Sequence, residues 1–107
     1  MNTENRHIET FEADWHGIAL RISWEPSWLN MGERLGYDTA HLQIEATRPD
    51  HAALPITETG YRSHFTTPAT VAAFGGPVAF VLAWLDEGSV SADWKRREQE
   101  ARQFSLF

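Results

Sequence analysis

The stretch Ile18-Ala19-Leu20-Arg21-Ile22-Ser23-Trp24-Glu25 places large apolar side chains at every second position. A period of two predicts a β-strand with one buried face and one face in solvent. Pro26 ends this strand, because proline cannot donate a hydrogen bond to a neighbouring strand. Residues 7–15 alternate in a similar way, and His16-Gly17 between the two runs allows a tight turn. Residues 7–25 are therefore predicted to form an antiparallel hairpin.

Two more strands and then helices are expected further along the chain. Residues 40–46 alternate again, and a short strand is predicted over residues 60–65. At Thr67-Pro68 the pattern changes, because threonine is a favoured N-cap and proline is favoured at the first helical position. The sequence thus predicts an α+β fold, in which a four-stranded, mainly antiparallel sheet over residues 7–66 is followed by three helices over residues 67–103.

The helix expected over residues 77–87 decides where the core lies. Its segment Val78–Leu85 is apolar on all sides, so we expect it to be buried against one face of the sheet. The side chains predicted to form this core come from both the strands and the helix: Ile18, Leu20, Ile22, Leu42, Ile44, Phe80 and Trp84. The last helix, from residue 92 to about residue 103, is strongly charged and is expected to be mostly exposed.

The composition indicates one soluble domain. A chain of 107 residues with 42% hydrophobic residues is sufficient for a single packed core. The absence of cysteine excludes disulfides and thiolate metal sites and suits a reducing cytoplasm. The polar start, Met1-Asn2-Thr3-Glu4, lacks the layout of a signal peptide, and the apolar run is too short to cross a bilayer. We therefore expect a cytoplasmic protein.

The charge is unevenly distributed along the chain. The formal net charge is −6, and the four basic residues of the last 17 positions lie outside an acidic body. Affinity for phosphate backbones comes largely from lysine and arginine, so direct binding to nucleic acid is not expected. An acidic surface is suited to a basic protein partner, including one that normally holds DNA.

The last five residues, Gln103-Phe104-Ser105-Leu106-Phe107, have the chemistry of a docking peptide. Leu106 and Phe107 are adjacent apolar anchors that can fill a preformed pocket. The amide of Gln103 can both donate and accept a hydrogen bond at the polar rim of such a pocket. We therefore divide the chain into a single α+β domain at residues 1–102 and a partner-binding tail at residues 103–107.

This tail resembles the short peptide, Gln-x-[Ser/Asp]-Leu-Phe, by which bacterial polymerases and repair factors bind the DNA sliding clamp. The usual second residue of that peptide is leucine, and Phe104 retains its apolar character with more bulk. The resemblance implies that Gln103, Phe104, Ser105, Leu106 and Phe107 bind the clamp. It also implies a small non-enzymatic protein that acts in, or regulates, DNA replication or repair.

Three other interpretations remain open. The tail can instead fold back on the core as a hydrophobic latch. The acidic body also fits an inhibitor of the anti-restriction or anti-CRISPR type, encoded by a mobile element such as a plasmid, that blocks a nucleic-acid-binding host complex. A small enzyme would be centred on Glu58, Arg62 and His64, of which the first is a possible general base and the second a possible anion clamp.

Metal and cofactor chemistry is not expected. The five histidines, His7, His16, His41, His51 and His64, show no spacing typical of a zinc site. His41 and His64 would share an exposed face only if the register of their strands allowed it. We therefore predict no metal, no cofactor and no catalytic turnover.

Overall fold

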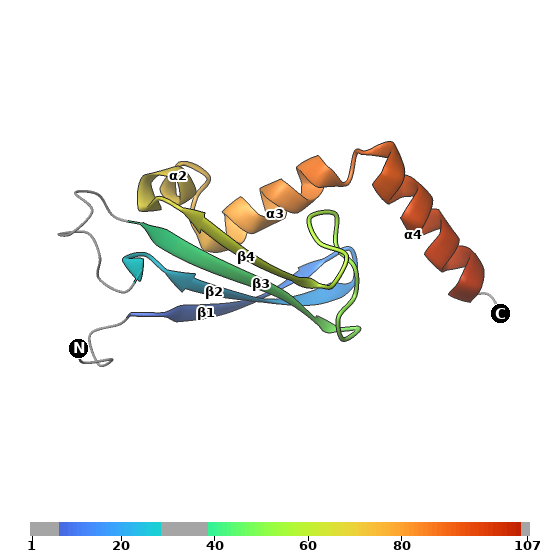
Figure 1. Ribbon diagram of the computed structural model, residues 1–107, viewed down its shortest axis with the longest axis horizontal. Coiled ribbons are helices and arrows are strands. Elements are labelled where there is room, and N and C mark those ends of the chain that lie inside the picture. Colours follow the sequence, from blue (N-terminus) through green and yellow to red (C-terminus); the bar gives the residue numbers. More distant parts are fainter. Residues whose placement is uncertain (1–6, 29–38, 106–107) are drawn as a thin grey trace.

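The computed structural model describes residues 7–28 and 39–105, and it confirms the predicted α+β fold. Four strands, β1 (Glu9–Trp15), β2 (Ile18–Glu25), β3 (Ala40–Arg48) and β4 (Tyr61–Thr66), form one antiparallel sheet in the order β1-β2-β3-β4. Three helices follow them: α2 (Pro68–Ala73), α3 (Pro77–Gly88) and α4 (Ala92–Ser105). Helices α2 and α3 lie over one face of the sheet, whereas α4 extends away from it (Figure 1).

The first two strands are joined by the two-residue turn that the sequence predicts. His16 and Gly17 both have positive φ angles, of 51° and 84°, and the Cα partners Trp15 and Ile18 flank them. Two central residues with positive φ match the twist of the adjoining strands, which is why such turns are common in hairpins. This turn sets the register of β1 and β2.

The helices begin where the sequence places their start signals. The Thr67 hydroxyl accepts a hydrogen bond from the Thr70 backbone N–H at 3.2 Å, and Pro68 occupies the first turn of α2. Pro77 likewise opens α3. None of the described helices is both long enough and apolar enough to span a bilayer.

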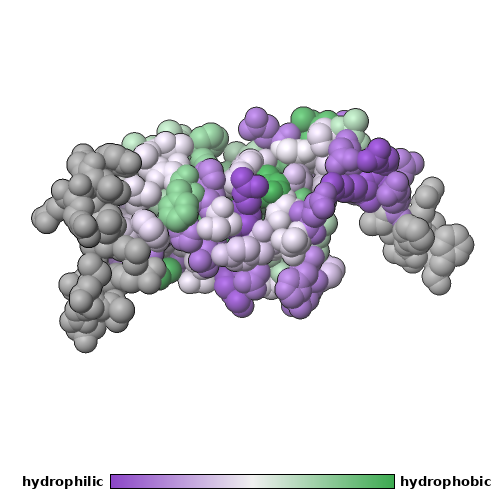
Figure 2. Space-filling model, in the orientation of Figure 1, coloured by the Kyte–Doolittle hydropathy of each residue, from purple (hydrophilic) through white to green (hydrophobic). Residues whose placement is uncertain are grey.

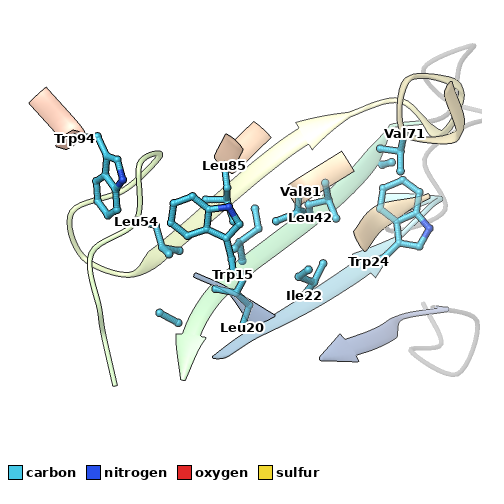
Figure 3. Close-up of a cluster of buried hydrophobic side chains, with 13 residues drawn as sticks. Trp15, Leu20, Ile22, Trp24, Leu42, Leu54, Val71, Val81, Leu85 and Trp94 are labelled. Carbon is cyan, nitrogen blue, oxygen red and sulfur yellow. The ribbon is translucent and has the colours of Figure 1, made fainter. Parts of the chain in front are cut away.

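The core lies between the sheet and α3 (Figure 3). Of the seven predicted core residues, Leu20, Ile22, Leu42 and Ile44 are completely buried. The other three, Ile18, Phe80 and Trp84, are only partly buried and pack against the cluster. Val81 and Leu85 are the fully buried residues of α3, and Phe80 and Trp84 are half-buried beside them.

A hydrogen bond between a strand and a helix accounts for an acidic residue at an unfavourable position. Asp86 lies in the last turn of α3, where a negative charge opposes the helix dipole. Its Oδ1 accepts a hydrogen bond from the indole Nε1–H of Trp15 at 2.8 Å. Trp15 is 4% exposed, so its N–H needs a partner within the protein. Asp86 supplies that partner and ties α3 to the end of β1.

The last helix makes the molecule elongated. The Cα atoms extend over 54 × 24 × 19 Å, with a radius of gyration of 15.9 Å. A compact chain of this length has a radius of about 13 Å. In Figure 1 the red helix α4 leads away from the sheet. The fold thus consists of a sheet-and-helix body with a protruding helical arm.

Candidate functional site

The arm is anchored to the body through its first two turns. The Ser91 hydroxyl accepts a hydrogen bond from the backbone N–H of Trp94 at 3.1 Å, which caps the start of α4. The Trp94 side chain is 8% exposed, and its ring lies 5.9 Å from that of Trp15. In Figure 3 Trp94 occupies one end of the hydrophobic cluster, near Leu54. Trp94 is therefore the main apolar attachment of the arm.

Charged contacts surround this attachment. Arg97 forms ion pairs with Glu58, in the loop before β4, and with Asp93 one turn earlier in α4. Glu98 lies 3.9 Å from the imidazole of His16 in the β1–β2 turn. The Glu58 side chain is 75% exposed, so its pair with Arg97 is screened by water and adds little stability.

Three of the five predicted partner-binding residues belong to the end of α4. The backbone of Gln103, Phe104 and Ser105 forms the last turn of α4, which extends two residues beyond the predicted end of this helix. Leu106 and Phe107 lie outside the described residues. On the face shown in Figure 2, the surface of α4 is coloured as strongly hydrophilic. The tail is thus connected to the body by a polar helix.

The residues of the possible enzyme centre have separate partners. Glu58 pairs with Arg97, while Arg62 donates a hydrogen bond to the carbonyl oxygen of Ile56 at 3.3 Å. The Arg62 guanidinium also lies 5.3 Å from the ring centroid of Trp84. His64 contacts the Trp84 ring, with centroids 4.6 Å apart. Arg62 and His64 therefore share an aromatic environment on the helix-covered face of β4, and Glu58 is engaged by the arm.

The register of β3 and β4 determines how His41 and His64 lie relative to one another. His41 is opposite Phe65, whereas His64 is opposite Leu42, so the two imidazoles lie on different faces of the sheet. On its own face, Nε2 of His41 lies 2.6 Å from the Ser63 hydroxyl. This cross-strand contact was not foreseen, because it depends on register. A serine–histidine hydrogen bond alone is insufficient for acyl transfer, which also requires oxyanion donors.

Within the described ranges, no three histidine, aspartate or glutamate side chains are grouped as a metal site would require. The expectation of a metal-free protein stays a prediction.

A concave aromatic surface lies beside β4. A cavity of about 280 Å³, here called the aromatic cavity, is lined by His64, Phe74, Phe80, Trp84 and Glu87. These residues come from β4, from the C-cap of α2 and from α3. Desolvation of the imidazole, and then the positive charges of Arg62 and His41, hold the pKa of His64 below its usual value. His64 is consequently neutral at pH 7.

The sequence spacing groups two of the residues that line the aromatic cavity. Phe80 and Trp84 are four positions apart, so they share one face of α3. The sequence predicts both as core residues, because the segment is apolar throughout. Phe74, which is 52% exposed at the end of α2, joins them only through the fold.

Comparison with known proteins identifies a family but no characterised relative. No curated protein and no solved structure matches the chain. A family model described as the KlcB third domain matches residues 8–94. The matched segment includes the whole sheet, α2, α3 and the aromatic cavity, and it ends at Trp94, before the tail. Because the family model matches most of the chain, the chain belongs to the KlcB third-domain family.

Proposed function

We propose that this protein is a small non-enzymatic interaction protein that binds the bacterial DNA sliding clamp through its tail. In this proposal Leu106 and Phe107 fill an apolar pocket on the clamp, and Gln103 sets the register at the rim. The protein acts in the cytoplasm, in DNA replication or repair or in their regulation. The body needs no affinity for DNA, because the clamp brings it there.

The geometry of α4 is the observation that supports the proposal. Its most distal contacts with the body, among those described, are made by Arg97 and Glu98. The helix then continues to Ser105, over about 10 Å at 1.5 Å per residue. Such an arm carries the start of the tail away from the sheet (Figure 1), as docking to a separate protein requires.

The helical state of the first tail residues also fits reversible docking. Gln103, Phe104 and Ser105 form the end of a helix, where the last carbonyl groups lack partners within the helix. Unwinding one terminal turn is inexpensive, since helix ends fray readily. The tail can therefore adopt the conformation that a pocket selects without unfolding the body.

A retention experiment with bacterial lysate tests this proposal. The full-length protein, a variant ending at Arg102 and the Leu106→Ala/Phe107→Ala variant are immobilised separately, and retained proteins are identified by mass spectrometry. We expect the full-length protein to retain the clamp and the two variants with an altered tail to lose it. An Ile8→Ala/Val90→Ala control removes two exposed apolar side chains outside the tail and should retain it fully. Equal retention of the clamp by all four proteins would contradict the proposal.

A second candidate function is supported by the family and by the charge. The KlcB third domain points to a plasmid-associated protein, and the net charge of −6 is concentrated in the body. Both features suit a plasmid-encoded acidic inhibitor that occupies the DNA-binding surface of a host complex. In the same experiment, a nucleic-acid-binding complex retained by the variant ending at Arg102 would favour this function.

A further inference from the structure

The aromatic cavity combines the features by which proteins recognise cations. The Phe74 and Phe80 rings are nearly perpendicular, at 88° with centroids 5.2 Å apart, and the Phe80 and Trp84 rings are tilted by 59° at 6.1 Å. The face of an aromatic ring carries partial negative charge. The three rings line one space at different angles, and a cation within about 6 Å of any ring face is attracted to it.

One cation of the protein already uses this property. The Arg62 guanidinium lies 5.3 Å from the Trp84 centroid, within the range of about 6 Å for cation–π attraction. Arg62 is not among the residues that line the cavity, so its contact does not fill the space. The contact shows that Trp84 holds a positive group in this environment.

The other lining groups set the preferred charge of a ligand. Glu87 is exposed at the cavity and contributes a carboxylate. His64 contributes a neutral imidazole at pH 7, so it does not repel a cation. The acidic body around them adds a further attraction for positive charge. The Arg62 guanidinium opposes that attraction, and Glu87 offsets it.

The size of the cavity limits what can enter. About 280 Å³ is slightly below the 300–1,000 Å³ of clefts that enclose small-molecule ligands. A single extended side chain fits better than a cofactor. Phe74, which is 52% exposed, extends the apolar surface outward and can contact the aliphatic stem of such a side chain.

We propose that the aromatic cavity is a binding site for a lysine or arginine side chain presented by a basic segment of a partner protein. The aromatic rings contact the cationic head and its stem, and Glu87 pairs with the charge. This site belongs to the body and is separate from the tail, so it defines a second interaction that does not depend on clamp binding.

Fluorine NMR of the full-length protein labelled with 5-fluorotryptophan tests the site. The chain has five tryptophans, and the Trp84→Phe variant identifies the resonance of Trp84. The probes are blocked Gly-Lys-Gly and Gly-Arg-Gly peptides, with Gly-acetyllysine-Gly as a neutral peptide of similar shape. We expect the two cationic peptides to shift the Trp84 resonance with millimolar affinity, and the neutral peptide to leave it unchanged.

Three variants separate the contribution of the Glu87 charge from that of the Phe74 ring. Glu87→Gln and Phe74→Leu should each weaken the cationic peptides about two- to fivefold, the size expected for one exposed cation–π or ionic contact. Phe74→Leu keeps an apolar side chain and removes only the ring, so it distinguishes cation–π attraction from simple burial. Glu100→Gln on α4 removes the same charge elsewhere and should have no effect.

Several outcomes would overturn the proposal. These are equal binding of the neutral peptide, unchanged affinity in both cavity variants, or no shift of the Trp84 resonance by either cationic peptide. A shift that grows with protein concentration in the absence of peptide would assign the cavity to a second copy of the chain and would equally refute a foreign partner.

Discussion

Trp94 of α4 lies against Trp15 of β1, with ring centroids 5.9 Å apart and planes tilted by 50°. This contact joins the arm to the sheet. No partner among the described residues accepts a hydrogen bond from the buried indole N–H of Trp94. Burying such a group costs about 1–3 kcal/mol, so the apolar contact is partly offset by lost hydration. Trp94 therefore stabilises the attachment of the arm by less than the burial of its ring alone would.

Trp94→Ala should destabilise the protein and release the arm. Removal of a large buried aromatic side chain costs about 3 kcal/mol. A helix of 14 residues is only marginally stable without packing, so the variant should also lose helical ellipticity. Urea unfolding and far-UV circular dichroism measure the two effects. Trp94→Phe, which also removes the unpartnered N–H, should cost about 1 kcal/mol or less. A Trp94→Ala variant with native stability would contradict this anchoring.

Asp86→Ala should destabilise the body by about 1–2 kcal/mol. The substitution leaves the Trp15 N–H without its acceptor at the end of the core. Asp86→Asn is the matched control, because its amide oxygen can still accept the hydrogen bond and the charge that opposes the α3 dipole is gone. We expect the control to be as stable as the wild type in thermal unfolding. Equal losses in both variants would show that charge matters instead.

The ion pair between Arg97 and Glu58 should contribute little. Their side chains are 35% and 75% exposed, and pairs of this kind are worth about 0.2–1 kcal/mol. A double-mutant cycle with Glu58→Gln and Arg97→Gln measures the coupling, which should decrease as salt is raised. A coupling well above this range would mean that charge, rather than Trp94, attaches the arm.

His64 should make the folded state sensitive to mild acid. Desolvation of the imidazole, then Arg62 and His41, lower its pKa from 6.5 in the folded state, and Glu87 is the acidic group beside it in the cavity. As the pH falls below 6.5, the unfolded chain takes up a proton that the folded protein resists. Stability is therefore lost from pH 6.5 downward, until the folded pKa is reached.

The measurement compares the free energy of unfolding of the wild type and His64→Asn between pH 7.5 and 5.5. The wild type should lose more stability than His64→Asn over this range, because only its folded state resists protonation at position 64. The other four histidines are present in both proteins, so the difference isolates His64. An equal dependence of the unfolding free energy on pH in the two proteins would disprove the effect of His64.

The fold could be predicted from the sequence, because the patterns that determine it are local. The alternation in Ile18–Glu25, the turn at His16-Gly17 and the cap at Thr67 each depend on neighbouring residues, and each is found as predicted. The core positions of β2 and β3 follow from the same alternation.

The surface contacts could not be predicted from the sequence, because they join residues that are far apart in the chain. The contact of His41 with Ser63 needs the register of β3 and β4, which no local pattern fixes. Phe80 and Trp84 are apolar residues in an apolar helix, so nothing local distinguished the wall of a cavity from the core. The ion pair of Glu58 with Arg97 likewise joins residues 39 positions apart.

Isothermal titration calorimetry of a purified bacterial sliding clamp with the full-length protein measures whether the tail docks on the clamp. We expect a dissociation constant on the order of micromolar, because the peptide is short. The Leu106→Ala/Phe107→Ala variant should bind the clamp about thirtyfold or more weakly. The affinity should change little with salt, because the anchors are apolar. Equal binding by both proteins, or none by either, would contradict this docking. A double variant that instead melts several degrees lower would assign the tail to the core as a latch.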